Sequence, residues 1–204
     1  MIGDYFVDKC TSTAIENAPW PHQHVADTLP KDSFKKLREC CEKINIESAD
    51  PKFLYAKDFK DYNIDFEDEI YSIAKAILEN AKVLCGQYPK YRWFQNLDVN
   101  AHIAIIPPLH KFKVHHEARQ KIWSSITYIT PEKNIGTKMY TAQNEKAFIK
   151  EAVWNPNSTF IFCGQKGKTW HSYESDQTTN RITLCLFLVK TTFQIWKKVL
   201  KNQL

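Results

Sequence analysis

The spacing of apolar residues changes near residue 91, and this change restricts the possible folds more than any other feature. Before that point, apolar side chains recur every three or four residues, as in amphipathic helices. After it, they gather in short runs rich in β-branched and aromatic residues, separated by turn formers. Helices followed by many short strands are typical of an antiparallel sandwich or barrel. We therefore predict an α+β, mainly β fold: a jelly roll braced by N-terminal helices.

Two helices are expected in the first part of the chain. The first follows Leu29-Pro30, with Asp32 or Ser33 as its N-cap. The second runs from about residue 66 to residue 84 and carries one apolar stripe. Specificity is expected to reside in the variable N-terminal part and in the loops, including those within residues 45–65 and 131–148.

The β-rich part is interpreted as a series of strands, with one more strand before the first helix, at residues 22–26. The strands predicted after residue 91 span residues 92–99, 102–106, 112–116, 122–130, 137–141, 147–153, 158–163, 169–174 and 181–190.

The chain of 204 residues, 43% of them hydrophobic, is long enough to bury one full core. We expect a single domain: residues 1–90 as a helical support region, 91–190 as the β core, and 191–204 as a short amphipathic helix. The apolar face of that last helix would allow a homodimer.

Charge and cysteine usage exclude several classes of protein. The net charge of +5 arises from 28 basic and 23 acidic residues that are interspersed, so no basic block indicates a nucleic-acid or membrane surface. The six cysteines form no C-x-x-C pair and are interpreted as reduced thiols. Because no export signal or long apolar stretch is visible, a cytoplasmic protein is expected.

Three residues in the β-rich part have the chemistry of a metal site. His115 and Glu117 are two residues apart, and such residues point to the same face of a strand. His171 follows 56 residues later (171 − 115), far enough to come from a different strand. Two histidines and one carboxylate form the facial triad of non-haem iron(II) sites, which leaves the opposite coordination positions open.

Arg181 opens a β-rich run ten residues after His171 (181 − 171), and Thr183 shares its face. A guanidinium binds a carboxylate through two hydrogen bonds, and a neighbouring hydroxyl can add a third. A dicarboxylate that reaches from the metal to Arg181 would fit this arrangement.

The spacing of these residues resembles the iron(II)/2-oxoglutarate oxygenase superfamily, whose members fold as a double-stranded β-helix. The similarity covers roughly residues 112–190 and includes the run 125–130, Gly136-Thr137 with Tyr140, and Trp170-His171. The opening Trp20-Pro21-His22 resembles small bacterial and phage-encoded members related to prolyl hydroxylases.

The resemblance implies a dioxygenase that hydroxylates a peptide or a small molecule and releases succinate and CO2. Its cofactors would be Fe(II), the cosubstrate 2-oxoglutarate and O2. His115, Glu117 and His171 would be the metal ligands, and Arg181 and Thr183 would bind the cosubstrate. Tyr128 or Tyr140 would hydrogen-bond the cosubstrate, and Ser125 or Thr127 would orient the ligands.

Several alternatives remain open at this point. Most of the superfamily has aspartate where this chain has Glu117, and His116 would replace His115 if the strand register differed. A β-helix protein with a vestigial metal site would bind a ligand or have a structural role, without catalysis. A cupin-like metalloenzyme would ignore 2-oxoglutarate, although Arg181 argues against it. Peptidyl proline, a free amino acid and a nucleobase are all compatible with the sequence.

Overall fold

A computed structural model describes residues 1–44, 48–88, 97–176 and 179–190. Its strands form two antiparallel sheets, one with the order β1-β7-β4-β9-β3-β2 and one with the order β6-β5-β8. The strands of the large sheet are β1 (His22–Val25), β2 (Lys52–Tyr55), β3 (Leu97–Ile106), β4 (Lys121–Thr130), β7 (Thr159–Phe162) and β9 (Arg181–Lys190). Those of the small sheet are β5 (Thr137–Tyr140), β6 (Phe148–Ala152) and β8 (Trp170–Ser172).

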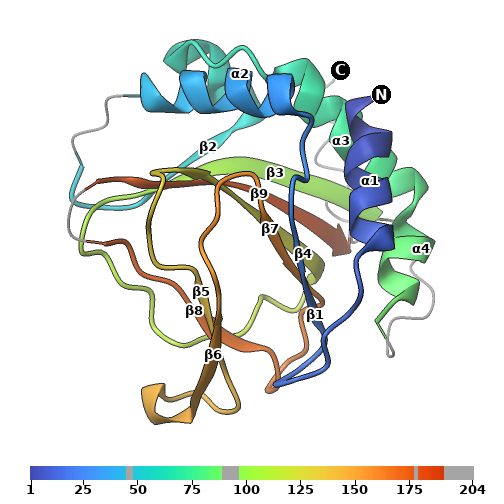
Figure 1. The fold of residues 1–204 in the computed structure, drawn as a ribbon, viewed down its shortest axis with the longest axis vertical. Coiled ribbons are helices and arrows are strands. Elements are labelled where there is room, and N and C mark those ends of the chain that lie inside the picture. The colour runs from blue at the N-terminus through green and yellow to red at the C-terminus, as the bar shows by residue number, and fades with distance from the viewer. Residues whose placement is uncertain (45–47, 89–96, 177–178, 191–204) are drawn as a thin grey trace, which may run out of the picture.

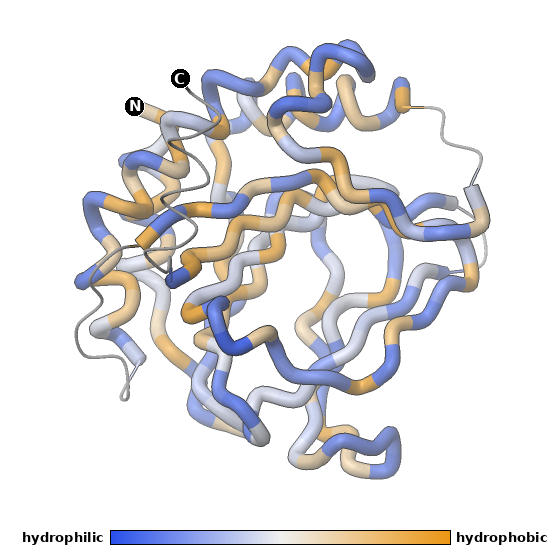
Figure 2. Tube along the Cα trace, turned by 180° about the vertical axis from the view of Figure 1, so that it is seen from behind, coloured by the Kyte–Doolittle hydropathy of each residue, from blue (hydrophilic) through white to orange (hydrophobic). Residues whose placement is uncertain are grey.

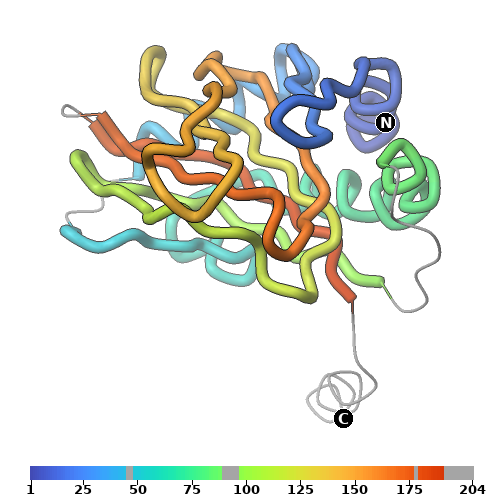
Figure 3. The backbone as a smooth tube through the Cα atoms, turned by 90° about the horizontal axis from the view of Figure 1, so that it is seen from below, coloured from blue at the N-terminus to red at the C-terminus, as the bar shows by residue number. Residues whose placement is uncertain are grey.

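Helices cover one face of the large sheet, and the small sheet lies across its other face (Figure 1). The helices are α1 (Ile2–Ser12), α2 (Lys31–Glu42), α3 (Glu67–Glu79) and α4 (Ala81–Gly86), with 3-10 turns η1 (Ala56–Tyr62) and η2 (Glu145–Ala147). Seen from below, α1 lies beside the α3–α4 segment (Figure 3). This is the predicted double-stranded β-helix braced by N-terminal helices.

The strand β9 explains how the two layers are held together. Because successive side chains of a strand point to opposite faces, β9 contributes to two separate cores. One set packs with the helices: Ile182, Leu184, Leu186 and Leu188. The other set faces the space between the sheets: Arg181, Thr183, Cys185 and Phe187. The central strands are therefore mostly apolar, and the loop around η2 at the edge of the small sheet is mostly hydrophilic (Figure 2).

The helical part differs from the sequence prediction in three ways. Helix α1 was not predicted; it buries Phe6 and Cys10, one turn apart, against α3 and α4. Helix α2 has Pro30 as its N-cap instead of Asp32 or Ser33, so Asp32 lies in the first turn, where its charge favours the helix dipole. The helix predicted over residues 66–84 is two helices.

The break between α3 and α4 falls at Asn80. Its side-chain amide donates to the carbonyl of Ala76 at 2.9 Å, and its backbone N–H bonds to the same carbonyl. Asparagine competes in this way with regular helical hydrogen bonding, which is why it favours helix ends.

Three strand predictions were also wrong. Residues 112–116 form only one isolated bridge, between His115 and His171, because this segment runs irregularly beside β8. Residues 97–106 form one continuous strand among the described residues, whereas we predicted that one strand ends at residue 99 and the next begins at residue 102. The strand is continuous because exposed Asn100 pairs in register with Phe187. Residues 45–65, expected to be a loop, contain β2 and η1. The predicted strand residues 92–96 and the predicted C-terminal helix at 191–204 lie outside the described residues.

In the described part of the chain, no helix combines the length and the apolar character needed to cross a membrane.

Gly136 provides a test of how closely β5 and β6 approach each other. A Cβ atom at Gly136 would lie 1.7 Å from the backbone oxygen of Ala152, whereas at Gly86 it would meet nothing within 4 Å. We expect Gly136→Ala to lower the free energy of unfolding by roughly 1–3 kcal/mol, because the two backbones must move apart. The matched control Gly86→Ala should be neutral or stabilising by up to about 1 kcal/mol. Urea denaturation measures both; equal effects would contradict the close approach.

Candidate active site

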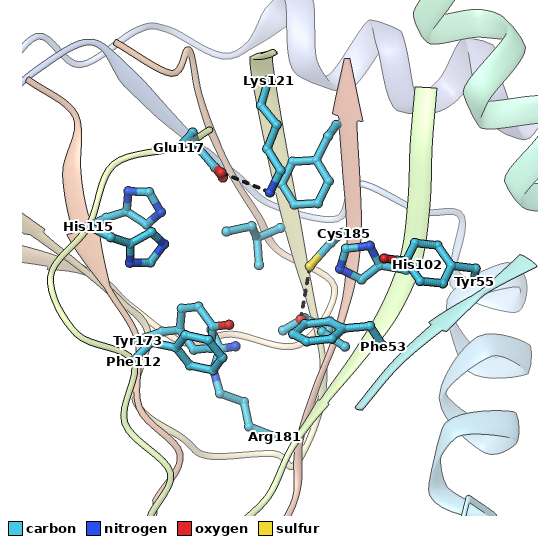
Figure 4. A pocket seen from close by; sticks show the side chains of 15 residues that line it. Phe53, Tyr55, His102, Phe112, His115, Glu117, Lys121, Tyr173, Arg181 and Cys185 are labelled. Carbon is cyan, nitrogen blue, oxygen red and sulfur yellow. Dashed lines mark hydrogen bonds and ion pairs between the residues drawn. The ribbon is translucent and has the colours of Figure 1, made fainter. Parts of the chain in front are cut away.

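A pocket of about 310 Å³ opens between the two sheets. Its lining comes from β2, β3, β4 and β9 of the large sheet, from β8, and from the irregular segment before β4 (Figure 4). The lining residues are Phe53, Tyr55, His102, Ala104, Phe112, His115, Glu117, Lys121, Ile126, His171, Tyr173, Arg181, Thr183, Cys185 and Phe187. The side chains predicted as metal ligands and the two predicted to bind a dicarboxylate, Arg181 and Thr183, all contribute to this one pocket.

His115 and His171 lie next to each other, with ring centroids 4.4 Å apart. Two reciprocal backbone hydrogen bonds of 2.9 Å hold their chain segments together. Nδ1 of His115 bonds to the carbonyl of Lys113 at 2.8 Å, and Nδ1 of His171 bonds to that of Thr169 at 3.0 Å. A carbonyl only accepts, so each Nδ1 is the donor, and Nε2 is the nitrogen left for another partner.

Burial favours the neutral form of His171. Its pKa is lowered to about 4, first by burial and then by the neighbouring His115. The imidazole is therefore neutral near pH 7, which is the form that binds a metal ion.

Glu117 enters the pocket from the same segment, but its carboxylate is already engaged. Oε2 lies 3.0 Å from Nζ of Lys121, and Ser124 donates to Oε1 at 3.2 Å. Burial acts to raise the pKa of Glu117, yet electrostatic interaction with His171 and with Lys121, together with the Lys121 hydrogen bond, outweighs it and lowers the pKa. With His171 neutral near pH 7, Lys121 is the cation that keeps this carboxylate ionised.

In the structure the carboxylate of Glu117 is directed toward Lys121 (Figure 4). Among the described residues, no three histidine, cysteine, aspartate or glutamate side chains are arranged so that they could hold a metal ion as placed. His115, Glu117 and His171 thus share the pocket without forming a closed ligand set. His116 is not part of the lining; its ring packs against Trp170, with centroids 4.8 Å apart.

Arg181 is the most unusual side chain of the site. It is only 2% exposed, and its Nε and Nη2 have no hydrogen-bond partner among the described residues. Instead, three aromatic rings surround the guanidinium carbon: those of Trp154 and Tyr173 at 4.9 Å and that of Tyr128 at 5.5 Å. Burial lowers the pKa of Arg181, but a guanidinium stays charged at any ordinary pH. The pocket therefore holds a buried cation with two nitrogen atoms, Nε and Nη2, that have no hydrogen-bond acceptor among the described residues.

Other predicted residues occupy different places. The hydroxyl of Tyr128 donates to Thr137 at 3.0 Å, and Tyr128 does not line the pocket. The hydroxyl of Tyr140 pairs with that of Ser172 at 2.8 Å. The Thr183 hydroxyl lies in the lining, 3.5 Å from the sulfur of Cys185.

The polar contacts of the neighbouring strand also differ from the predicted ones. Ser125 bonds to a backbone carbonyl of β9, and Thr127 bonds to Thr159. The hydroxyl that reaches a predicted ligand is that of Ser124.

Sequence reasoning missed the aromatic part of the lining. Tyr173 is two residues after His171 and lies on the same face, so strand periodicity could have identified it. Phe53 and Tyr55 were assigned to a loop, and nothing in their spacing indicated a strand beside the pocket. His102 also lines the pocket, and no motif around it in the sequence indicates this.

No protein-family model and no curated protein matches the sequence. Solved structures do match the fold. A prolyl-4-hydroxylase from Pseudomonas putida is 14% identical, with 94% of this chain and 100% of that chain covered and a TM-score of 0.53. A Trichoplax adhaerens prolyl hydroxylase, solved with a hypoxia inducible factor peptide fragment, is 9% identical over 92% of this chain and 89% of that one, with a TM-score of 0.58.

A viral collagen prolyl hydroxylase from Paramecium Bursaria Chlorella virus-1, solved with 2OG, is 12% identical over 83% of this chain and 96% of that one, with a TM-score of 0.54. At such low identities the likeness establishes the fold alone. The chain therefore has the double-stranded β-helix fold found in 2-oxoglutarate-dependent oxygenases.

The buried guanidinium of Arg181 leads us to expect that its replacement has an unusual effect on stability. Replacing a buried cation in which two nitrogen donors lack acceptors among the described residues with an apolar side chain of similar length removes a desolvation cost. We expect Arg181→Met to raise the free energy of unfolding of the ligand-free protein by roughly 1–3 kcal/mol. Arg119→Met, on the exposed surface, should change it by less than about 0.5 kcal/mol. A clear loss of stability in Arg181→Met, measured by urea denaturation, would show that the guanidinium already has strong partners.

The lowered pKa of His102 leads us to expect that the stability of the fold depends on pH. Burial, followed by the charge of Lys121, lowers its pKa from 6.5 to about 4, although Glu117 opposes this. A histidine with a lowered folded-state pKa stabilises the fold above pH 6.5, and this contribution is lost as the pH falls toward about 4. Urea denaturation at several pH values should show a smaller loss in His102→Phe than in the wild type over that range. Parallel curves for the two proteins would exclude this role.

Proposed function

We propose that this chain is an iron(II)- and 2-oxoglutarate-dependent oxygenase that hydroxylates a peptide or a small molecule, releasing succinate and CO2. The observation that carries the proposal is the buried guanidinium of Arg181, whose Nε and Nη2 have no hydrogen-bond partner within the described part of the chain. It lies in the same pocket as two adjacent imidazoles and a carboxylate.

The residues present fit 2-oxoglutarate at one end of the pocket. A charged group that is buried and unpaired costs free energy, and a carboxylate that accepts two hydrogen bonds from a guanidinium offsets that cost. Thr183, on the same strand face, offers a hydroxyl to the same carboxylate. Arg181 would thus fix the distal end of the cosubstrate and direct its keto-acid end toward the histidines.

The residues also fit a ferrous ion at the other end. His115 and His171 have Nε2 lone pairs that no internal hydrogen bond uses, and each ring is oriented by a carbonyl at Nδ1. Glu117 adds an anionic oxygen. Iron bound there would supply the redox chemistry that couples O2 to decarboxylation of the cosubstrate. The chain positions the reactants and excludes water from the buried end of the pocket.

Glutamate in place of aspartate is compatible with this assignment. The longer side chain allows Glu117 to reach Lys121 and Ser124 as well as the pocket. A peptide substrate is supported by the Trichoplax adhaerens structure, which contains a peptide fragment. A small molecule is supported equally by the modest volume of the pocket.

One observation favours a second candidate function. The ion pair between Glu117 and Lys121 withholds the carboxylate from the histidines. A protein that binds a dicarboxylate through Arg181 without catalysis, with a vestigial metal site, would have the same arrangement. Chelation of the cosubstrate to iron separates the two functions, because it requires the complete ligand set.

The test is the anaerobic addition of iron(II) and then 2-oxoglutarate to the purified protein. We expect a visible metal-to-ligand charge-transfer band in the wild type, because the keto acid chelates the iron. His171→Ala should abolish the band by removing a metal ligand. Arg181→Met should require roughly 100-fold more 2-oxoglutarate to form it, through the loss of charge-assisted hydrogen bonds.

His116→Ala is the matched control, since His116 adjoins His115 but does not line the pocket. Its band should equal that of the wild type. A wild-type protein that binds 2-oxoglutarate without any band would support the second candidate, and a band that survives His171→Ala would exclude the proposed ligands.

A further inference from the structure

The wall of the pocket that faces away from the two histidines is aromatic and belongs mainly to β2 (Figure 4). This strand is the edge of the large sheet, and it pairs with β3 so that Tyr55 lies opposite His102 and Phe53 opposite Ala104. Phe53 and Tyr55 are 40% and 42% exposed. Large aromatic side chains that stay this exposed beside a pocket are typical of a binding surface.

The rings of this wall are arranged around His102. Phe53 and Tyr55 meet the imidazole edge to face, at 5.3 and 5.4 Å between centroids, and Phe187 lies at 5.5 Å. His102 is only 8% exposed, and its Nδ1 has no hydrogen-bond partner among the described residues. A neutral polar atom left unpaired at that depth costs free energy, which a ligand that hydrogen-bonds to it would restore.

A small side chain makes room in front of this wall. Ala104 lies between Phe53 on one neighbouring strand and Thr183 on the other. Because successive strands are about 4.8 Å apart, a methyl group at this position leaves a hollow between the aromatic wall and the residue proposed to bind the cosubstrate.

Charge excludes some occupants of this hollow. Lys121 pairs with Glu117, and its ammonium group covers the face of Phe187 at 3.5 Å. In the proposed function, Arg181 binds the distal carboxylate of the cosubstrate. Phe53, Tyr55 and neutral His102 add no charge, so a charged substrate group would be desolvated there without an ion partner.

The hollow also adjoins a second groove. Tyr55 and Lys121 line both the pocket and a surface groove of about 500 Å³ that includes Tyr71 and Asn100. A substrate longer than a single amino acid could therefore extend from the pocket across Tyr55.

We propose that Phe53, Tyr55 and His102 form the recognition site for the primary substrate, and that it takes an uncharged aromatic ring with a hydrogen-bonding group, of the phenol or indole type, carried on a peptide. This inference rests on the proposed function, because it needs the iron and cosubstrate at the opposite wall. Aromatic pairs gain stability beyond their buried area, which a saturated ring does not provide.

The experiment uses the full chain loaded with zinc(II), which is redox inert, and with 2-oxoglutarate. Saturation-transfer NMR titrations measure the dissociation constants of three acetylated and amidated tripeptides: Ala-Tyr-Ala, Ala-Pro-Ala and Ala-Lys-Ala. We expect the tyrosine peptide to bind roughly three- to tenfold more tightly than the other two. Phe53→Ala should remove most of that preference.

Phe148→Ala is the matched control, because Phe148 is similarly exposed, at 46%, but lies on β6 outside the pocket. It should bind the tyrosine peptide as the wild type does. The iron and 2-oxoglutarate absorption band, recorded for each variant, distinguishes failure of the substrate-recognition site from failure of the proposed function. A normal band with equal binding of all three peptides, or with Phe53→Ala unchanged, overturns the inference alone. Absence of the band in the wild type overturns the proposed function and this inference with it.

Discussion

The buried guanidinium of Arg181 is the interaction on which the rest of the site depends. A cation that is almost wholly removed from water, with two nitrogen donors unpartnered, is costly for the free protein. The fold tolerates it because β9 packs four aliphatic side chains against the helices on its opposite face. Three aromatic rings also partly compensate the lost hydration. Apolar packing on one face of the strand thus offsets the cost of a buried cation on the other.

The same alternation explains how residues distant in sequence meet. The large sheet presents Arg181 and Thr183 from one side of the pocket, while two chain segments joined by backbone hydrogen bonds present His115 and His171 from another. Glu117 lines the pocket, and its carboxylate forms an ion pair with Lys121. The ends of a bound 2-oxoglutarate would therefore be held by different layers of the fold.

Much of this arrangement could be predicted from the sequence, because local patterns determine it. Strand periodicity placed Arg181 and Thr183 on one face, and the change of period near residue 91 predicted a jelly roll braced by helices. His115 and Glu117 both line the pocket although their segment is not a regular strand. Side chains two residues apart in an extended segment still point to the same side. The prediction failed where tertiary contacts decide: the edge strand β2 is specified by pairing with β3, so Phe53 leaves no local signal.

The central claim is that Arg181 binds the distal carboxylate of 2-oxoglutarate, and calorimetry tests it most directly. The iron(II) protein is titrated anaerobically with 2-oxoglutarate and with 2-oxopentanoate, which lacks that carboxylate, in the wild type and in Arg181→Met. The wild type should bind 2-oxoglutarate about 100-fold more tightly than 2-oxopentanoate, and the variant should bind the two ligands alike. Equal affinities in the wild type, or a preference that persists in Arg181→Met, would contradict the account.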